Sequence, residues 1–345
     1  MLLPTLTLKL GRTDLGLLRQ AAERLWHHAT VYDLADVNEH TKPPLATLVA
    51  SVLLLVPQAL QERLWDLFNL VAFLAWGKRY ATSRRHLLVG ILFTLNAWNA
   101  EILMGQFNLL TLWGMIWATE GKSPLRGAGL VLALLFKPAN LVFLPWVWRY
   151  GRRRGLLLSA AATLAVLAGV YAGVFGPGAL FADHLAWWRF LPGSVAKHLL
   201  RDDNYGLPSL VAQVAGGINT STPWMVVGLL LAIWVTRREE KTSALAWLAG
   251  IGIVVSPMAW LQNYSLLLAA NLVWLSEYRR RQMFQIGVAL ALVYVFHQGW
   301  NPTLKPYLGV FAAFRPPLLA WLVASSLIVS SLRFQRHSDR RFSSD

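Results

Sequence analysis

The sequence predicts an all-α, polytopic helical membrane protein, and three observations support this prediction. Of the 345 residues, 56% are hydrophobic and only 14% are charged, whereas soluble chains are about 45–50% apolar and about 25% charged. Apolar runs separated by polar breaks recur from residue 44 to residue 332. The net charge of +15 comes from Lys and Arg residues that cluster between these runs. The chain therefore has too few polar side chains to cover a surface that faces water.

The apolar runs give the expected helices. They lie near residues 44–60, 63–76, 86–98, 103–118, 125–136, 139–149, 155–175, 223–236, 243–255, 262–275, 284–297 and 316–332. Several are shorter than the roughly 20 residues that a perpendicular helix needs to cross a bilayer. We therefore expect about 9–11 membrane-embedded helices, some of them short or re-entrant.

The basic clusters set the expected orientation, because cytoplasmic loops carry an excess of Lys and Arg. The clusters lie at residues 78–85, 149–154, 237–241, 279–281 and 333–341. The breaks at 99–105, 176–222, 256–262 and 298–306 are expected outside. Both flanks of 125–149 are basic, so this segment should go out and return, with its turn at Lys137-Pro138 because proline breaks a helix. If residues 10–43 lie outside and residues 77–86 in the cytoplasm, the runs 44–60 and 63–76 together cross the membrane once. Residues 44–60 should therefore dip into the membrane and return, or lie shallow.

The segment before the first run is polar, with a helical pattern of apolar residues. Residues 10–43 carry charges of both signs, while Leu15, Leu18, Ala22, Leu25 and Trp26 recur at helical spacing. This pattern predicts an amphipathic helix on the membrane surface. We expect one integral membrane domain over 1–332, with external loops at 10–43 and 176–222, and a basic cytoplasmic tail at 333–345.

Polar residues set among apolar ones are the functional candidates, because intramembrane polar groups are costly. Lys137 follows Leu134, Leu135 and Phe136, and a lysine at a helix break can hold a phosphate as a point charge; a snorkelling or paired lysine is the alternative. Glu101, Gln106 and Asn108 surround Gly105 between two apolar runs, either as a site or as an ordinary polar loop.

A second polar and aromatic break follows Ser256-Pro257. Trp260, Gln262 and Asn263 offer an indole ring and amides, which suit sugar recognition by stacking and hydrogen bonding, although an aromatic belt explains most of the 17 Trp residues. The chain has no Cys, which excludes disulfides and thiol catalysis. The His spacings match no zinc pattern, so no metal is expected.

Five landmarks occur in order along the chain. They are Thr13-Asp14-Leu15 with Val31-Tyr32-Asp33; Thr41-Lys42-Pro43-Pro44-Leu45; Gly105-Gln106-Phe107-Asn108; Ala128-Gly129-Leu130 with Phe136-Lys137-Pro138; and Asn204-Tyr205-Gly206-Leu207-Pro208 with Ser256-Pro257 and Trp260. In this order they resemble glycosyltransferase family 87, the polyprenyl-phosphate-dependent mannosyltransferase-like enzymes of the GT-C superfamily. The last element often continues to a histidine in that family, where this chain has Gln262 and Asn263.

The resemblance implies transfer of a hexose, mannose, from a polyprenyl-phosphate donor to a lipid or glycan acceptor, with inversion, on the external face of a bacterial inner membrane. It implies that Asp14, rather than Asp33, Asp36, Asp183, Asp202 or Asp203, is the catalytic base. Lys137 would bind the donor phosphate. Substrate contacts would come from Gln106, Asn108, Asn204, Trp260, Gln262 and Asn263. Membrane lipids are the expected surroundings, with no cofactor and no nucleic acid.

Two other classes of function remain open on the sequence. A transporter or flippase for a lipid-linked or polar substrate would also use broken helices and intramembrane polar groups, but we find no internal repeat. An inactive membrane scaffold that has kept the fold is the second alternative.

Overall fold

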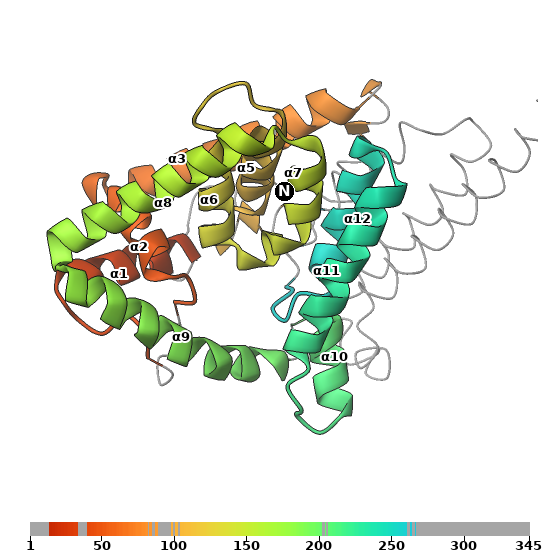
Figure 1. The fold of residues 1–345 in the computed structure, drawn as a ribbon. Coiled ribbons are helices and arrows are strands. Elements are labelled where there is room, and N and C mark those ends of the chain that lie inside the picture. Colours follow the sequence, from red (N-terminus) through yellow and green to blue (C-terminus); the bar gives the residue numbers. More distant parts are fainter. Residues whose placement is uncertain are drawn as a thin grey trace, which may run out of the picture.

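The computed structural model describes residues 14–33, 40–81, 83–84, 87–88, 98, 101–102, 104–201, 204, 206–260, 263 and 266. Within these residues every regular element is an α-helix or a short 3-10 helix, which confirms the all-α prediction for this part of the chain (Figure 1). The helices expected near 284–297 and 316–332, and the basic tail, lie outside the described residues.

The amphipathic helix predicted near the start is present as α1 (Asp14–Trp26). Its buried face consists of Leu15, Leu18, Ala21, Ala22 and Leu25. This face packs against protein, because Leu18 clusters with Ala50 and Phe107, and Leu25 with Leu45, Leu48 and Tyr171. The location of the helix at a membrane surface stays a prediction. The spacing of the apolar residues predicted the helix, but not the residues that pack on its apolar face.

The chain bends sharply at residues 56–57. Helix α2 (Pro44–Ala50) begins with a proline, which suits a first helical turn, and continues as the 3-10 helix η2 (Ser51–Leu55). Helix α3 (Gln58–Tyr80) then leaves at 115° to this pair. The bend is compatible with the shallow segment expected at 44–60, whose depth in a membrane stays a prediction.

The central part of the fold is a tight out-and-return segment. Helix α5 (Asn108–Glu120) packs on α6 (Arg126–Phe136), which is followed by η3 (Pro138–Phe143), α7 (Leu144–Tyr150) and α8 (Arg153–Phe175). The guanidinium of Arg126 donates to the carbonyl of Arg152, so the segment returns to where it began. The reversal predicted at Lys137 is seen, and the course of 125–149 relative to a membrane stays a prediction.

The region 176–222 is more regular than the polar loop expected there. It folds into α9 (Pro177–Leu199) and α10 (Leu207–Val214). Gly176, with φ of 93°, makes the turn out of α8, and Pro177 opens α9. Phe190, Ser194 and Leu199 are buried along α9, so this helix packs against the rest of the protein in spite of its charged residues. Helices α11 (Ser221–Arg238) and α12 (Lys241–Val254) follow (Figure 1).

Three basic clusters gather at one end of the molecule. Glu120, at the end of α5, pairs with Arg79 from the end of α3 and, at 2.8 Å, with Lys241 from the start of α12. The Arg149 guanidinium of α7 donates to the carbonyl of Thr236 in α11. Because α5 runs from Asn108 to Glu120, and α6 from Arg126 to Phe136, Asn108 and Lys137 lie at the opposite end.

Among the described helices, α8 is long and apolar enough to cross a membrane, and α2–η2 with α3 would add a second span if the bent pair is counted as one. Helices α6 and α12 are apolar but shorter. Many large apolar side chains of α3, α8 and α11 are exposed, among them Phe68, Val71, Leu158, Val166, Leu230 and Trp234.

Candidate functional site

A carboxylate and two lysines from three separate segments lie within electrostatic range of one another. Asp14 is the first residue of α1, Lys42 lies two residues before α2, and Lys137 ends α6. Both lysines are near enough to Asp14 to act on its charge. The sequence places Asp14 and Lys137 more than a hundred residues apart, and the fold brings them into one electrostatic cluster.

Burial influences the pKa of Asp14 more strongly than the neighbouring cations do. A base that is ionised at neutral pH would be favoured by polar surroundings and by a cation that holds its pKa down. Instead, burial raises the pKa of Asp14 above its usual value, while Lys42 and Lys137 act in the opposite direction. The cations are present as expected, but the loss of water around the carboxylate outweighs them.

Lys42 is the residue of this cluster to which the sequence analysis gave no role. Its carbonyl accepts a hydrogen bond from the Tyr32 hydroxyl at 2.9 Å, and the neighbouring Thr41 carbonyl accepts one from the Trp187 indole at 3.1 Å. The Lys42 ammonium lies 5.6 Å from the centre of the Phe107 ring. Burial lowers the pKa of Lys42 and Asp14 opposes that effect. Only the two prolines that follow Lys42 hinted at a fixed backbone here.

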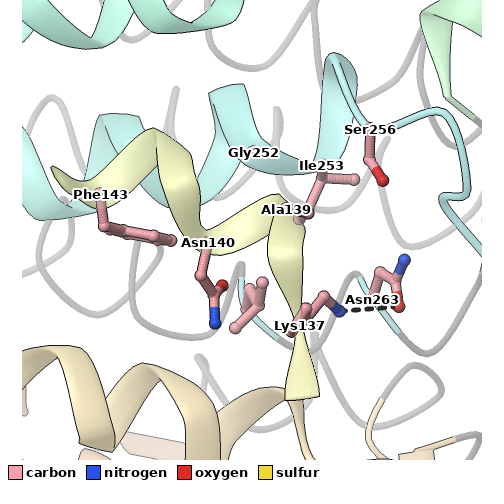
Figure 2. Close-up of a pocket in the computed structure, with 9 residues that line it drawn as sticks. Lys137, Ala139, Asn140, Phe143, Gly252, Ile253, Ser256 and Asn263 are labelled. Carbon is pink, nitrogen blue, oxygen red and sulfur yellow. Dashed lines mark hydrogen bonds between the residues drawn. The ribbon is translucent and has the colours of Figure 1, made fainter. Parts of the chain in front are cut away.

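Lys137 is held by two amides rather than pointing into lipid. Its ammonium donates to Asn108 Oδ1. It also donates, at 3.1 Å, to Asn263 Oδ1, as Figure 2 shows. Glu101 is close enough to interact with its charge. The lysine lines a narrow pocket together with Asn140, Phe143, Ile253, Ser256, Asn263 and Leu266. Neither Asp14 nor Asn204, the other site residues that the resemblance implies, belongs to the lining of this pocket.

The Gly-Gln-Phe-Asn turn aims Asn108 at Lys137. Gly105 has φ of 63°, a conformation that glycine adopts without strain. The Gln106 carbonyl accepts hydrogen bonds from the Trp65 indole at 3.0 Å and from the Asn69 amide at 3.1 Å. Glu101 Oε1 accepts the backbone N–H of Leu109 at 3.1 Å. Glu101, Gln106 and Asn108 are all buried, so this segment is not an ordinary solvated loop.

Asn204 fastens the α9–α10 connection to the Ser-Pro-x-x-Trp segment. Its Nδ2 donates to the carbonyls of His198 at 3.0 Å and Pro257 at 2.7 Å. Its Oδ1 accepts the N–H groups of Gly206 and Ala259, both at 3.1 Å. These four bonds fill the capacity of an amide side chain, which favours a positioning role over the substrate contact predicted for Asn204.

The segment after Ser256-Pro257, which Asn204 holds, also contacts Lys137 through Asn263. Asn263 Nδ2 donates to the Met258 carbonyl at 2.9 Å while its Oδ1 faces Lys137. Trp260 contacts the His198 ring edge-to-face, with 5.4 Å between the ring centres. A side chain added at Gly206 would collide with the Ser256 carbonyl, which explains the glycine two residues after Asn204. Gln262 lies outside the described residues.

The other aspartates weighed as the catalytic base are exposed, bonded elsewhere or outside the described residues. Asp33 is exposed, and Asp183 accepts a hydrogen bond from the Tyr171 hydroxyl at 2.5 Å. Asp36, Asp202 and Asp203 lie outside the described residues. In the part of the chain that the structure describes, no three His, Cys, Asp or Glu side chains are grouped so that they could hold a metal ion.

Comparison with known proteins agrees with the landmarks. The model of glycosyltransferase family 87 matches residues 40–257, which is more than half of the chain. Searches of curated proteins and of solved structures found no match. The matched region includes Lys42, Asn108, Lys137 and Asn204 and begins after Asp14. The family makes glycosyl transfer the activity class of this protein. The chain belongs to glycosyltransferase family 87.

Proposed function

We propose that the protein transfers a hexose, mannose, from a polyprenyl-phosphate donor to a lipid or glycan acceptor at the external side of a bacterial inner membrane. The observation that carries this proposal is the grouping of Asp14 with Lys42 and Lys137. One carboxylate and two cations match the needs of a direct displacement at a sugar phosphate, which releases one proton and one phosphate.

In the proposed reaction, Asp14 accepts the proton of the acceptor hydroxyl. The acceptor oxygen forms a bond to the anomeric carbon of the sugar as the bond from that carbon to the phosphate oxygen breaks. The leaving polyprenyl phosphate keeps the electron pair, and Lys137 stabilises its charge. A single displacement inverts the anomeric carbon. Burial of Asp14 supports its role, because a carboxylate with a raised pKa is a stronger base.

The proposed location follows from the two ends of the molecule. If the basic end lies in the cytoplasmic headgroups, α5, with 13 residues, places Asn108 about 20 Å further along the membrane normal, at 1.5 Å per residue. The hydrocarbon core is about 30 Å thick. The amide-bound Lys137 would then sit in the external half of the bilayer, recessed below its surface. A lipid-borne phosphate can reach that depth from the side.

Transfer of labelled sugar tests the proposal. Membranes containing the protein are given a polyprenyl-phosphate donor with a radiolabelled mannose, and extracted lipids and glycans are examined for new labelled product. Asp14→Asn removes the base and is expected to lower turnover more than a hundredfold while donor binding changes little. Glu240→Gln, an exposed carboxylate at the basic end, is the control.

Two results would contradict the proposal. Asp14→Asn retaining more than about a tenth of wild-type turnover would leave less than about 1.4 kcal/mol of barrier to that carboxylate. Movement of intact donor across the bilayer without any new product would indicate a flippase, and neither product nor movement would indicate a scaffold.

A further inference from the structure

We propose that α9 docks on the phospholipid headgroup layer at the external side of the membrane, through a stripe of apolar side chains on its outward face. The α9 stripe consists of Phe181, Leu185, Trp188, Pro192 and Ala196. This inference rests on the membrane location in the function proposed above, and it adds an interaction surface to that function.

Helical spacing brings the members of the α9 stripe together. They recur at intervals of four, three, four and four residues, so they lie along one side of the helix. Phe181 is 72% exposed and Trp188 is 66% exposed, and Pro192 and Ala196 are exposed as well. A helix on the surface of a soluble protein turns polar side chains outward, whereas α9 turns two large aromatic rings outward.

The opposite side of α9 packs against the protein. Phe190 and Ser194 are buried there, and the Trp187 indole donates a hydrogen bond to the Thr41 carbonyl at 3.1 Å. These contacts fix the rotation of α9 about its own axis. The α9 stripe is therefore turned away from the described part of the protein.

The charges of α9 suit contact with lipid phosphates. Arg189 and Lys197 each come directly after a member of the α9 stripe, so both lie on the same flank of it. Asp183, the acidic residue of α9, is directed at α8 instead, where it accepts a hydrogen bond from the Tyr171 hydroxyl at 2.5 Å. Basic side chains beside an apolar face that carries Trp and Phe are typical of helices that lie in a membrane interface.

The connectivity places α9 at the end of the molecule away from the basic clusters. Helix α8 runs away from the arginines at 152–154, and α11 runs toward the arginines at 237–238. Helices α9 and α10 connect the far ends of these two helices (Figure 1). In the proposed orientation, α9 therefore lies at the level of the external headgroups.

The connection to α8 identifies lipid as the occupant of the α9 stripe. Helix α8 is long and apolar enough to cross a membrane, and Val166, Val170 and Val174 along it are exposed. Gly176, with φ of 93°, then turns the chain directly into α9. The α9 stripe thus begins where the lipid-facing surface of a span ends. Tryptophan is enriched at this level of a bilayer, where its ring meets both acyl chains and water.

Depth-dependent fluorescence quenching tests the docking. In this cysteine-free chain, Trp188→Cys carries an environment-sensitive fluorophore, and the protein is placed in phospholipid vesicles with a nitroxide either at the headgroup or deep in the acyl chain. The shallow nitroxide should quench the fluorophore about twofold more than the deep one, because interfacial helices insert only about 5–10 Å. Val166→Cys, near the middle of α8, is the depth reference and should show the reverse order.

Two further positions on α9 serve as matched comparisons. Phe181→Cys, also in the α9 stripe, should repeat the pattern of position 188, and it serves if Trp188→Cys does not fold. Ala186→Cys is exposed but lies outside the α9 stripe, so both nitroxides should quench it less than they quench position 188.

The outcomes separate this inference from the proposed function. Deep quenching at position 166 with no quenching at 181 and 188 would show that water or another chain covers the α9 stripe, and would overturn the docking while the transferase stands. Predominantly deep quenching at 181 and 188 would overturn it equally, because α9 would then enter the hydrocarbon. No quenching at position 166 would overturn the membrane location that both proposals share. Shallow quenching at 188 in protein that transfers no sugar would support the docking and overturn the proposed function instead.

Discussion

Replacing Lys137 with methionine tests its proposed role at the donor phosphate against its structural role. Its ammonium donates to Asn108 and Asn263, and in the proposed function it also binds the donor phosphate. Losing a charge-assisted contact to the phosphate costs about 1.5–3 kcal/mol, which corresponds to an increase in donor Kd of about 10- to 150-fold. Turnover at saturating donor should fall as well, since the leaving phosphate loses its cation.

The same substitution has a structural cost. Asn108 and Asn263 are buried, and each amide oxygen would lose its lysine donor, at about 1–3 kcal/mol per unsatisfied group. Release of a buried charge offsets part of this cost. We therefore expect the thermal unfolding midpoint to fall by several degrees, so affinity must be measured well below it.

Equilibrium binding of a polyprenyl-phosphate hexose to purified protein in detergent is the assay. Lys137→Arg keeps the charge and should retain most of the affinity, and Lys122→Met should match the wild type. The reasoning would be refuted by folded Lys137→Met protein whose donor Kd is within threefold of wild type. It would equally be refuted by Lys137→Arg losing as much affinity as Lys137→Met, because the charge would then not be what matters.

Three further predictions concern stability and topology. Burial, then Lys42 and Arg24, lower the pKa of His40 from 6.5 to about 3. Below pH 6.5 the unfolded chain therefore binds a proton that the folded protein does not bind. The free energy of unfolding should fall by about 2 kcal/mol by pH 5, and His40→Gln should flatten this part of the thermal-melting profile. A side chain at Gly127 would collide with the Ala160 backbone, so Gly127→Ala should cost about 1–3 kcal/mol, measured by melting, whereas Gly169→Ala, with open space around it, should not destabilise. In this cysteine-free chain, a cysteine at position 200 should react with an impermeant maleimide from outside and one at position 152 only after permeabilisation; the reverse pattern would invert the proposed orientation.

Short sequence patterns predicted the helices and turns that interactions between neighbouring residues determine. Helix α1 follows from the spacing of Leu15, Leu18, Ala22 and Leu25, and the turn at Lys137 follows from the proline after it. Asp183, His184, Arg189 and Lys197 give α9 the composition of a solvated loop, whereas the Gly176-Pro177 turn that starts it is a local signal for a helix.

The site was only partly predictable, because its contacts join distant segments. Asn108 and Lys137 were both singled out, but their hydrogen bond spans 29 residues of sequence. The bonds from Asn204 to Pro257 and Ala259 span more than fifty, and nothing local distinguishes an amide that binds backbone from one that binds a sugar. Lys42 lies within one of the landmarks, but the local sequence does not indicate its contact with Phe107, which is 65 residues away along the chain.

The charges of the site explain how its parts can work together. Asp14 and Glu101 face Lys42 and Lys137, so the described groups nearly balance before any substrate is bound. A donor phosphate would add negative charge beside Lys137 and so weaken the pull of that lysine on Asp14. In the proposed function, the carboxylate would then become a stronger base once the donor is in place. Donor binding at Lys137 would therefore activate the proposed base, Asp14, through short-range electrostatics.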